Sequence, residues 1–373
     1  MRVFVVNSGS SSIKYQLVDV ATESAVLSGL LERLGQPGGD AADHVAGMRV
    51  VLDRLGDDAA SIVAVGHRVV HGGSEFTAPT LIDDHVETAI AAISALAPLH
   101  NLANLAGIRA ARLALPRVPH VAVFDTAFHQ SMPASASTYA IDREVAAEYG
   151  VRRYGFHGTS HEFVAGRAAA VLGRPLASLK LIVLHLGNGS SAAAIDGGRS
   201  IDTSMGLTPL EGLVMGTRSG DIDPGALLHL VRMGMSVAEV DDLLNSHSGL
   251  LGLAGSADMR DIETAFDAGD PDAVLALDVW THRIRHYVGA YLAQLGGLDA
   301  LVFTAGIGEN APGLRARALD GLGHFGLALD TERNEAPSRA ARVISPEGAR
   351  VAVLVVPTNE ELAIAQATAA LVS

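Results

Sequence analysis

The sequence contains no cysteine, which excludes disulfides, thiolate zinc sites and cysteine nucleophiles together. Aromatic residues make up only 4% of the chain, so compact α/β packing is a better prediction than an aromatic-rich β-sandwich. No apolar run approaches the roughly 18 residues needed to cross a bilayer. The opening apolar run turns polar at Asn7, too early for a signal peptide. We therefore expect a cytoplasmic protein without a membrane partner.

Basic residues are also scarce. The chain has 27 lysines and arginines against 41 aspartates and glutamates, which gives a formal net charge of −14. Nucleic acids and acidic membrane surfaces select basic patches, so we expect no nucleic-acid partner. If the protein binds an anion, the cations must be gathered locally.

The apolar segments that are present indicate an α/β fold. The 373 residues suffice for two domains that each bury their own core. Strand-like runs alternate with Ala/Leu-rich stretches of helical spacing, at 62–65, 121–124, 181–186, 301–304 and 351–356. We expect a helix over 278–295 with Trp280 in the core, and we expect the Gly- and Asp-rich segment 35–58 at the periphery.

One Gly/Ser pattern occurs twice, at residues 3–12 and 181–191. The copies align at a constant offset of 180, with Gly9, Ser10 and Ser11 on Gly189, Ser190 and Ser191. Each copy is an apolar run that stops at a turn and then resumes, which predicts a hairpin whose tip offers N–H groups and hydroxyls to an anion. Either copy alone would be an ordinary hairpin tip. Two copies in register favour two related domains that grip one phosphate chain.

Two arginines lie in Gly-rich loops, Arg68 within 66–73 and Arg218 within 215–225. A guanidinium in such a loop can bind a carboxylate or phosphate through two parallel hydrogen bonds, because small neighbours let the ligand come close. The alternative is a surface arginine paired to a nearby acid, for which Asp221 or Asp223 could serve.

Two carboxylates also stand at informative positions. Asp125 ends an apolar strand, and ligands bind at strand ends in α/β sheets; its alternative role is to cap the next turn. Residues 358–361 predict a capping box, with Thr358 as N-cap and Glu361 reaching back, before a helix over 360–372. Glu360 would then stand in a first helical turn, either ordering a metal or only stabilising the helix N-terminus.

Two further motifs leave alternatives open. His157 and His161 are four residues apart, but Gly158 argues against a helix through the pair and no third zinc ligand is evident, so a hydrogen bond from histidine to an anion is favoured. Residues 306–311 imitate a dinucleotide-binding fingerprint, with Asp330 downstream. There Glu309 would face the pyrophosphate, so a loop against a nucleotide is preferred.

Taken together, these segments resemble the acetate kinase family over essentially the whole chain. The segments that carry the resemblance are 7–14, 66–73, 98–101, 124–133, 152–161, 185–191, 216–225, 306–310 and 357–361. The resemblance implies two duplicated ribonuclease-H-like domains of the actin, sugar kinase and Hsp70 type, closing over ATP in a homodimer. The expected boundaries are 1–127 plus 359–373 for the N-terminal domain and 128–358 for the nucleotide-binding and dimerisation domain.

The activity implied is reversible, Mg²⁺-dependent phosphoryl transfer from ATP to acetate, which yields acetyl phosphate and ADP by direct in-line attack. The resemblance assigns Mg²⁺, or Mn²⁺ in its place, to Asn7 and Glu360. It assigns the acetyl carboxylate to Arg68. The phosphoryl group in flight is assigned to Arg218 and His157, with His100 supporting that site. The expected nucleotide contacts are Lys14, His185, Leu186, Gly187, Asn188, Gly189, Asp258, Met259, Arg260, Gly306, Ile307, Gly308, Glu309 and Asn310. The expected methyl pocket is formed by Val70, Leu99, Phe156 and Pro209.

The chemistry agrees with this assignment, since a carboxylate with a pKa of about 4 to 5 is already ionised at neutral pH and needs no strong base. It needs charge neutralisation instead. Asp125 is described in this family as the catalytic acid or base; we interpret it as orienting Mg²⁺ or an arginine. Two departures from the family pattern are Leu102-Ala103 in place of a proline pair and Ala305 in place of glycine.

Rival functions remain. A filament-forming or chaperone member of the same superfold would also have two phosphate hairpins, but would not need a paired-arginine anion site. A propionate or butyrate kinase would use identical chemistry.

Overall fold

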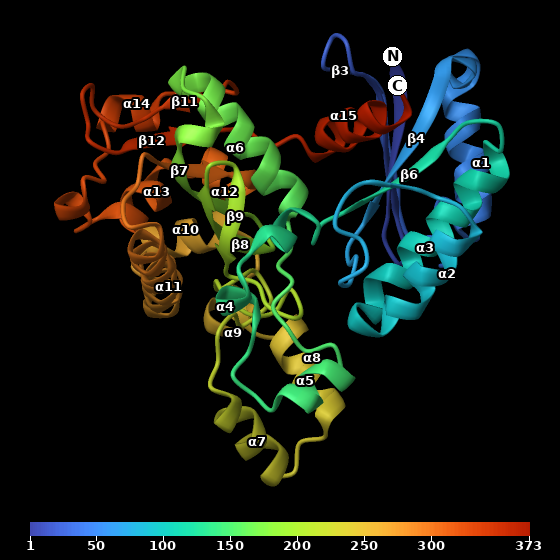
Figure 1. Ribbon diagram of the computed structural model, residues 1–373. Coiled ribbons are helices and arrows are strands. Elements are labelled where there is room, and N and C mark those ends of the chain that lie inside the picture. Colours follow the sequence, from blue (N-terminus) through green and yellow to red (C-terminus); the bar gives the residue numbers. More distant parts are fainter. The chain divides into compact units, whose positions relative to one another are not determined.

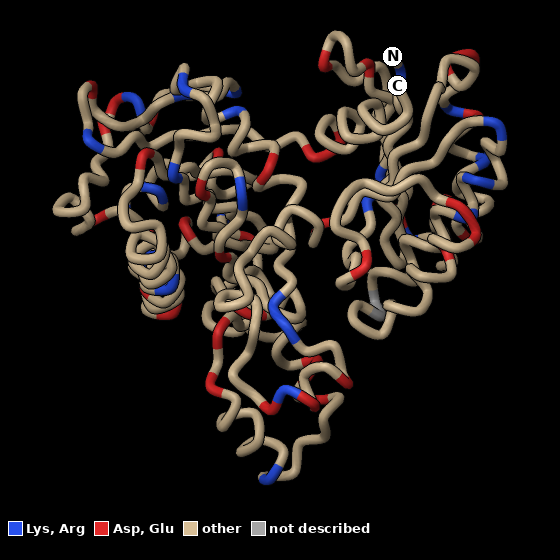
Figure 2. The backbone as a smooth tube through the Cα atoms, viewed as in Figure 1, with Lys and Arg blue, Asp and Glu red and all other residues tan. Residues whose placement is uncertain are grey.

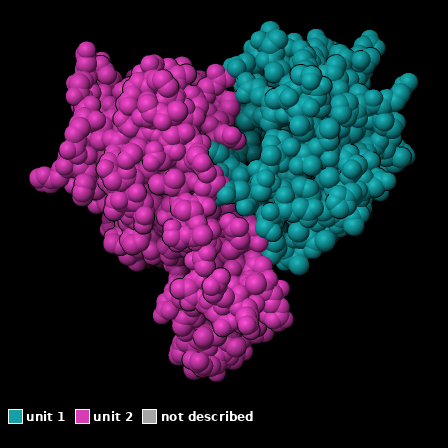
Figure 3. Space-filling view, viewed as in Figure 1, with its two compact units in different colours: residues 1–130, 156–160, 359–373 teal, residues 131–155, 161–358 magenta. Residues whose placement is uncertain are grey.

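A computed structural model describes residues 1–373 apart from the side chains of residues 98 and 99. The chain divides into two compact units, which are described separately here (Figure 3). Unit 1 comprises Met1–Gln130, Phe156–Ser160 and Asn359–Ser373, and unit 2 comprises Ser131–Gly155 and His161–Thr358.

Unit 1 is built on a six-stranded sheet of order β3-β2-β1-β4-β6-β5 (Figure 1). Its strands are β1 (Arg2–Ser8), β2 (Ile13–Asp19), β3 (Ser24–Leu31), β4 (Ile62–Val69), β5 (Thr80–Leu81) and β6 (His120–Phe124). Helices α1 (His44–Leu55), α2 (Asp84–Ala92) and α3 (Pro98–Ala114) lie on one face and α15 (Glu360–Val372) on the other. Strands β1, β4 and β6 run parallel, while β2, β3 and β5 join antiparallel.

Unit 2 contains a second six-stranded sheet, of order β11-β12-β10-β7-β8-β9. Its strands are β7 (Lys180–Leu186), β8 (Ser190–Asp196), β9 (Arg199–Thr203), β10 (Ala300–Thr304), β11 (Arg342–Val343) and β12 (Ala352–Val355). Its helices are α4 (Ala134–Ser137), α5 (Arg143–Glu148), α6 (Gly158–Leu172, whose first residues belong to unit 1), α7 (Pro224–Arg232), α8 (Val237–Ser246), α9 (Gly249–Ala254), α10 (Met259–Asp267), α11 (Pro271–Leu295), α12 (Ala305–Asn310), α13 (Pro312–Leu319) and α14 (Thr331–Glu335).

The two sheets have the same topology. Each starts with an antiparallel meander of three strands, β1-β2-β3 in one and β7-β8-β9 in the other. Each then adds two parallel strands beside the first strand and closes with a short antiparallel edge strand. The match of order and direction confirms the expected α/β class and the duplication inferred from the repeated Gly/Ser pattern.

Both repeated segments form hairpins, but their tips differ in length. The first hairpin closes with Ser8 opposite Ile13, and the second with Leu186 opposite Ser190. The constant sequence offset therefore places residues of the first turn on Ser190 and Ser191, which already belong to β8. Because the two turns differ in length, residues that align in the sequence do not occupy equivalent positions at the two hairpin tips.

The cores follow from the apolar strands. In unit 2, the buried residues of β7, β10 and β12 pack against α11, where Trp280 is buried as expected, together with Ile284 and Val288. Helix α11 begins at Pro271, earlier than predicted, because Asp270 caps it and Pro271 is favourable in a first turn. The expectation that 35–58 is peripheral is wrong, since α1 places Met48 and Val51 in the core of unit 1.

The cap predicted for the last helix is also wrong. The N-cap of α15 is Asn359, whose side-chain oxygen accepts the Leu362 N–H at 3.0 Å. Glu361 does not reach back because Lys14 Nζ lies 2.5 Å from its carboxylate. The Thr358 N–H donates instead to Glu309. The Glu361 carboxylate thus pairs with the charged Lys14 side chain instead of with the backbone N–H that the predicted capping box required.

Acidic and basic residues are interspersed over both units (Figure 2). Within the part of the chain that the structure describes, the search for a helix long and apolar enough to span a membrane finds none.

Candidate active site

The carboxyl ends of β4 and β6 bring Arg68 and Asp125 together in unit 1. The two strands are parallel and pair Arg68 with Val123, so Asp125, two residues later, lies just beyond the strand end. Arg68 Nε and Nη donate to the two Asp125 oxygens at 3.1 and 2.6 Å. Asp125 is only 2% exposed. It therefore holds the guanidinium through a buried bidentate pair rather than capping the next turn.

Helix α15 adds Glu360 to this pair, with Glu360 Oε2 at 3.9 Å from Arg68 Nε. The helix can approach the sheet because β4 has glycine at position 66. A Cβ there would lie 2.5 Å from the Thr368 hydroxyl and 2.7 Å from an Ile364 methyl carbon. Gly66 thus fixes how close α15, and with it Glu360, lies to Arg68.

Burial and charge oppose each other at this cluster. Burial alone would lower the pKa of Arg68, but the Asp125 and Glu360 carboxylates outweigh it and raise that pKa. Burial raises the pKa of Asp125, an effect that Arg68 counteracts and Glu360 reinforces. Arg68 therefore remains a cation at any physiological pH.

Asn7 and Lys14 lie on the face of the sheet that carries α15. Asn7 pairs directly with Lys14 across the β1–β2 ladder, and opposite residues of an antiparallel pair share one face. The Lys14 side chain is 57% exposed, and its ammonium group binds Glu361 in the first turn of α15. Asn7 is half-buried at the end of β1. Asn7 and Lys14 thus lie at the tip end of the β1–β2 hairpin, where Lys14 contacts the first turn of α15.

His157 lies beside the same strand end. Its backbone is left-handed, with φ at 57°, and the next residue, Gly158, donates its N–H to the Asp125 carbonyl at 2.8 Å. A Cβ at Gly158 would lie 2.3 Å from that carbonyl oxygen, so only glycine lets the loop sit here. Helix α6 begins at Gly158, which confirms that no helix runs through both His157 and His161.

Val70 and Phe156, two residues of the expected methyl pocket, are both buried and both belong to unit 1. The Phe156 ring meets the His71 ring edge-on at 5.5 Å. Its carbonyl is 3.0 Å from His129 Nε2, and burial lowers the pKa of His129 to about 4, so this histidine is neutral at pH 7. Val70 is 9% exposed.

Two asparagines of α3, which the sequence reasoning did not single out as site residues, hold the loop that follows Arg68. Asn104 Oδ1 accepts the Val70 N–H at 3.0 Å. The Asn101 amide accepts the His71 N–H and donates to the His71 carbonyl, at 3.0 and 2.9 Å. A signal was available, because buried asparagine on an amphipathic helix needs backbone partners.

The remaining residues predicted on α3 are less informative. His100 is exposed in the first turn of the helix. The Leu99 side chain lies outside the part of the molecule that the structure describes.

In unit 2, Arg218 is half-buried and its Nη1 donates to the Pro209 carbonyl at 2.7 Å. Burial lowers the pKa of Arg218. Among the described residues Arg218 forms no ion pair with a carboxylate, unlike Arg68. A partly buried guanidinium without a counter-ion is a favourable place for an anionic ligand.

The alternative partners weighed for Arg218 are both engaged elsewhere. Asp221 accepts hydrogen bonds from the Gly212 N–H, the Tyr287 hydroxyl and Arg283. Asp223 caps α7 through the Gly225 N–H. The interpretation of Arg218 as a surface arginine paired to a nearby aspartate is therefore wrong.

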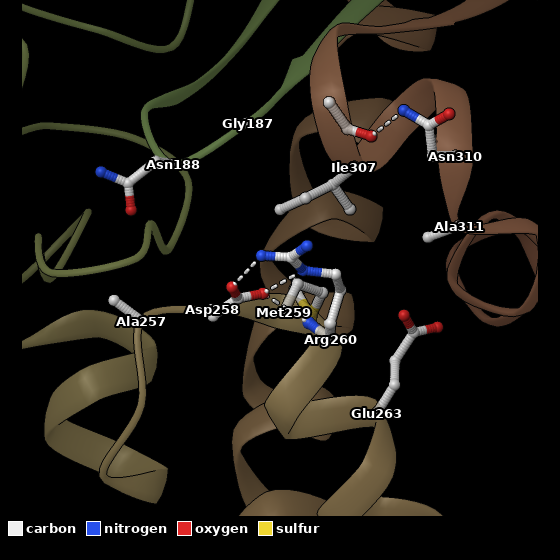
Figure 4. Close-up of a pocket in the computed structure, with 11 residues that line it drawn as sticks. Gly187, Asn188, Ala257, Asp258, Met259, Arg260, Glu263, Ile307, Asn310 and Ala311 are labelled. Carbon is white, nitrogen blue, oxygen red and sulfur yellow. Dashed lines mark hydrogen bonds and ion pairs between the residues drawn. The ribbon is translucent and has the colours of Figure 1, made fainter.

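A cavity of about 660 Å³ lies entirely in unit 2 (Figure 4). It is walled by the β7–β8 tip, the start of α10 and the α12 segment. The lining residues are Gly187, Asn188, Ala257, Asp258, Met259, Arg260, Glu263, Gly306, Ile307, Asn310 and Ala311. Asp258 caps α10 through the Arg260 N–H and also binds the Arg260 side chain, while Asn310 Nδ2 bonds the Gly306 carbonyl (Figure 4). Three predicted segments thus converge on one cavity.

The cavity differs in detail from the expected nucleotide contacts. Five of the expected contacts belong to the same segments but do not line the cavity: His185, Leu186, Gly189, Gly308 and Glu309. Glu309 instead accepts the Thr358 N–H at 3.1 Å. Glu263, which was not predicted, extends beside Arg260, and burial raises the pKa of its carboxyl group (Figure 4). Nothing in the sequence marks Glu263, one acid among many on helix faces.

The described residues contain no cluster of three His, Asp or Glu side chains that could hold a metal by themselves. Mg²⁺ does not require one, because it keeps several waters and binds one or two protein oxygens together with substrate phosphates. The oxygen donors of Asn7 and Glu360 fit that pattern. His157 and His161 do not form a zinc site with a third ligand among the described side chains.

Comparisons with known proteins show the family to which the chain belongs. The acetokinase family model matches residues 2–366. An acetate kinase of Clavibacter michiganensis subsp. michiganensis is 59% identical over 385 residues, covering 98% of this chain and 97% of that protein. The crystal structure of Porphyromonas gingivalis acetate kinase has 42% identity, complete coverage of both chains and a TM-score of 0.96. That of a propionate kinase from Francisella tularensis has 41% identity, 99% coverage of both and a TM-score of 0.93. This chain therefore belongs to the acetokinase family.

Proposed function

We propose that the protein is an ATP-dependent kinase of a small carboxylate, with acetate as its preferred acceptor and acetyl phosphate and ADP as products. The observation that carries the proposal is Arg218, a half-buried guanidinium with no carboxylate partner among the described residues. It belongs to the same unit as a cavity whose walls are the predicted nucleotide segments. An anion is required to complete such a site.

The chemistry requires charge neutralisation more than proton transfer. A carboxylate acceptor is ionised at neutral pH, and it must approach the negatively charged γ-phosphate of ATP. Arg218 would offset charge on the transferred phosphoryl group, and His157 would add a hydrogen bond to it. Preorganised donors of this kind lower the barrier without reorganising during the reaction.

Arg68 has a second role in this proposal. Its Nε and one Nη are held by Asp125, so the other Nη nitrogen can bind the acceptor carboxylate in a fixed direction. Asp125 would act by positioning Arg68, since it is buried and already paired. This supports the interpretation of Asp125 as an orienting group rather than as a proton carrier.

Asn7 and Glu360, which both belong to unit 1, would hold Mg²⁺. When bound there, the ion would neutralise charge on the ATP phosphates. Lys14, opposite Asn7 and paired with Glu361, would place a further positive charge near the nucleotide. Substitution by Mn²⁺ also remains a prediction.

Several broader expectations stay proposals. The domain boundaries after residues 127 and 358 are supported by the division of the chain into compact units near the same positions. A homodimer and a cytoplasmic location are inferred from the resemblance and from composition.

Propionate is the strongest alternative acceptor, because the propionate kinase of Francisella tularensis matches this chain almost as well as the acetate kinase of Porphyromonas gingivalis does. Turnover with acetate, propionate and butyrate at saturating ATP and Mg²⁺ decides between them. We expect kcat/KM to be highest for acetate and to fall by about tenfold or more with each added methylene, the scale of a pocket that is one carbon too small. A higher kcat/KM for propionate than for acetate would make propionate the preferred acceptor. Absence of turnover with all three acids would reject the proposed function.

Val70 gives this proposal a test within the pocket. The Val70→Ala variant should open space for one more carbon and lower KM for propionate, while KM for ATP remains within about twofold of the wild-type value. Steady-state kinetics with both acids measure the effect. If the ratio of the KM values for acetate and propionate is unchanged in this variant, Val70 does not line the acceptor pocket.

A further inference from the structure

A second cavity of unit 2, with a volume of about 460 Å³, lies behind the α12 segment. It is formed by the end of α12, the start of α13 and residues 334–342. Three arginines and two glutamates are among its lining residues, so its charge is positive in a chain that is strongly acidic overall. These charged residues are Arg315, Arg339, Arg342, Glu309 and Glu335.

Arg315 lines this cavity and holds its surrounding segments together through hydrogen bonds. It is 2% exposed, and its four hydrogen bonds all go to neutral acceptors. It donates to the Gly308 and Glu309 carbonyls at 2.9 and 3.0 Å and to the Asn334 side chain and carbonyl at 2.8 and 2.7 Å. A buried guanidinium held only by neutral groups keeps an uncompensated charge.

Arg342 brings a second charge to the same cavity. Its Nε is buried and has no hydrogen-bond partner, and its Nη1 reaches only the Ser338 carbonyl at 3.2 Å. Neither Arg342 nor Arg315 forms an ion pair with a carboxylate of the described residues. Burial lowers the pKa of Arg315 to about 10, and the positive charge of Arg342 nearby acts in the same direction. An anion between them would relieve both the repulsion and the unsatisfied donor.

We propose that this cavity is a second anion site, distinct from the one at Arg218, which takes the phosphate group of a small ligand. The planar donor face of Arg342 matches phosphate oxygens, and Arg339 is exposed at the same wall. The cavity exceeds the size of a bare phosphate ion, so an organic phosphate fits as well as free phosphate. Arg315 fixes the end of α12, which connects this site to the wall of the nucleotide cavity.

The test is isothermal titration of the full-length protein with inorganic phosphate. The Arg218→Ala background weakens anion binding at the proposed active site, and the effect of each further variant is measured against this parent. In that background, Arg342→Gln should weaken phosphate binding by about tenfold or more, the scale of a charge-assisted hydrogen bond. Glu335→Gln, which removes a negative charge from the same wall, should strengthen binding by about twofold to fivefold.

Arg350→Gln is the matched control. Arg350 is a basic residue of unit 2 that binds the Phe325 carbonyl and does not line the cavity. Phosphate affinity should change by less than about twofold in this variant. Glycerol 3-phosphate and glycerol distinguish the ligand: tighter binding of either phosphate compound than of glycerol supports the site, and the order of the two phosphates identifies the source.

Three outcomes would overturn the proposal. They are equal phosphate affinity in the Arg342→Gln and parent proteins, an equal loss in Arg350→Gln, or binding of glycerol as tight as that of glycerol 3-phosphate. If Arg342→Gln proves to be unfolded by circular dichroism, the Glu335→Gln gain decides, because a destabilised protein does not bind more tightly. The comparison of variants holds even if Arg218 lies outside the active site.

Discussion

At the scale of single residues, Arg68 and Arg218 differ in what surrounds them. Because of this difference, we expect their substitutions to differ in their effect on stability while both lower turnover. Arg68 neutralises a carboxylate that is almost fully buried. Arg218 is bonded to a backbone carbonyl and has no such partner among the described residues. Removal of the first therefore leaves an unpaired buried charge, whereas removal of the second does not.

We therefore expect Arg68→Ala and Arg218→Ala each to lose turnover by about a hundredfold or more, the scale for a preorganised charge-stabilising donor. Only Arg68→Ala should also lose stability, by about 3 kcal/mol, because Asp125 is left without its partner. Steady-state kinetics and urea unfolding measure the two effects.

Arg232→Ala, at an exposed position near the end of α7, serves as the control and should change neither quantity appreciably. Near-normal turnover of either test variant would remove that arginine from the site. Equal losses of stability would contradict the difference in their surroundings.

Ala305 shows how a departure from the family pattern acts at one residue. It stands where the resemblance leads one to expect glycine, and its φ is 64°, in the left-handed region that disfavours a side chain. Ala305→Gly should raise the free energy of unfolding by about 0.5–1 kcal/mol, because it relieves this strain. KM for ATP should change less than about twofold, since the neighbouring cavity walls keep their positions.

The control is Ala170→Gly, at an exposed position of α6. The same substitution there should lower stability by about 0.5–1 kcal/mol, because the backbone is helical. Destabilisation of Ala305→Gly by the same amount would show that the left-handed backbone carries no strain.

At the scale of elements, the distance between β4 and α15 decides where Glu360 stands. Gly66→Ala would place a Cβ within 2.5 Å of the Thr368 hydroxyl. We expect a loss of about 1–3 kcal/mol in the free energy of unfolding, as for other overpacked cores. The Mg²⁺ concentration for half-maximal activity should rise, because Glu360 moves with the helix.

A second substitution tests the cause. Thr368 has a buried hydroxyl with no hydrogen-bond partner among the described residues, so Thr368→Ala makes room at little cost. Combined with Gly66→Ala, it should restore part of the stability and of the Mg²⁺ response. Gly166→Ala, on an exposed position of α6 with open space around it, should not affect the Mg²⁺ response.

Strand ends were the elements that could be predicted best. The apolar run at 121–124 predicted a strand that ends just before Asp125, and β6 ends at Phe124. The run at 62–65 predicted the start of β4, but this strand continues through Arg68 to Val69, so the expectation that Arg68 lies in a loop is wrong. The cap of α15 could not be predicted in the same way. Thr358 and Asn359 are both good caps, and the choice depended on Glu309 and Lys14, which are distant in sequence.

At the scale of the whole molecule, we expect one phosphoryl transfer per turnover without a phosphoenzyme. The acceptor is ionised already, and a single in-line displacement needs no protein nucleophile. Transfer from ATP with a chiral γ-phosphate should therefore invert the configuration at phosphorus, as measured by ³¹P NMR of the acyl phosphate. Net retention would require a covalent intermediate and would contradict the direct mechanism.

The sequence by itself determined the α/β class, the duplication and the strands that carry the candidate site, because these depend on local hydrophobic pattern and on a repeated turn. It also identified Arg68, Asp125 and Arg218 as candidates. Only the tertiary structure decided that Asp125 holds Arg68, that Arg218 lacks an acidic partner among the described residues, and that Arg315 and Arg342 meet in one cavity. Charge pairing depends on distances across the fold, and no pattern of neighbouring residues encodes those distances.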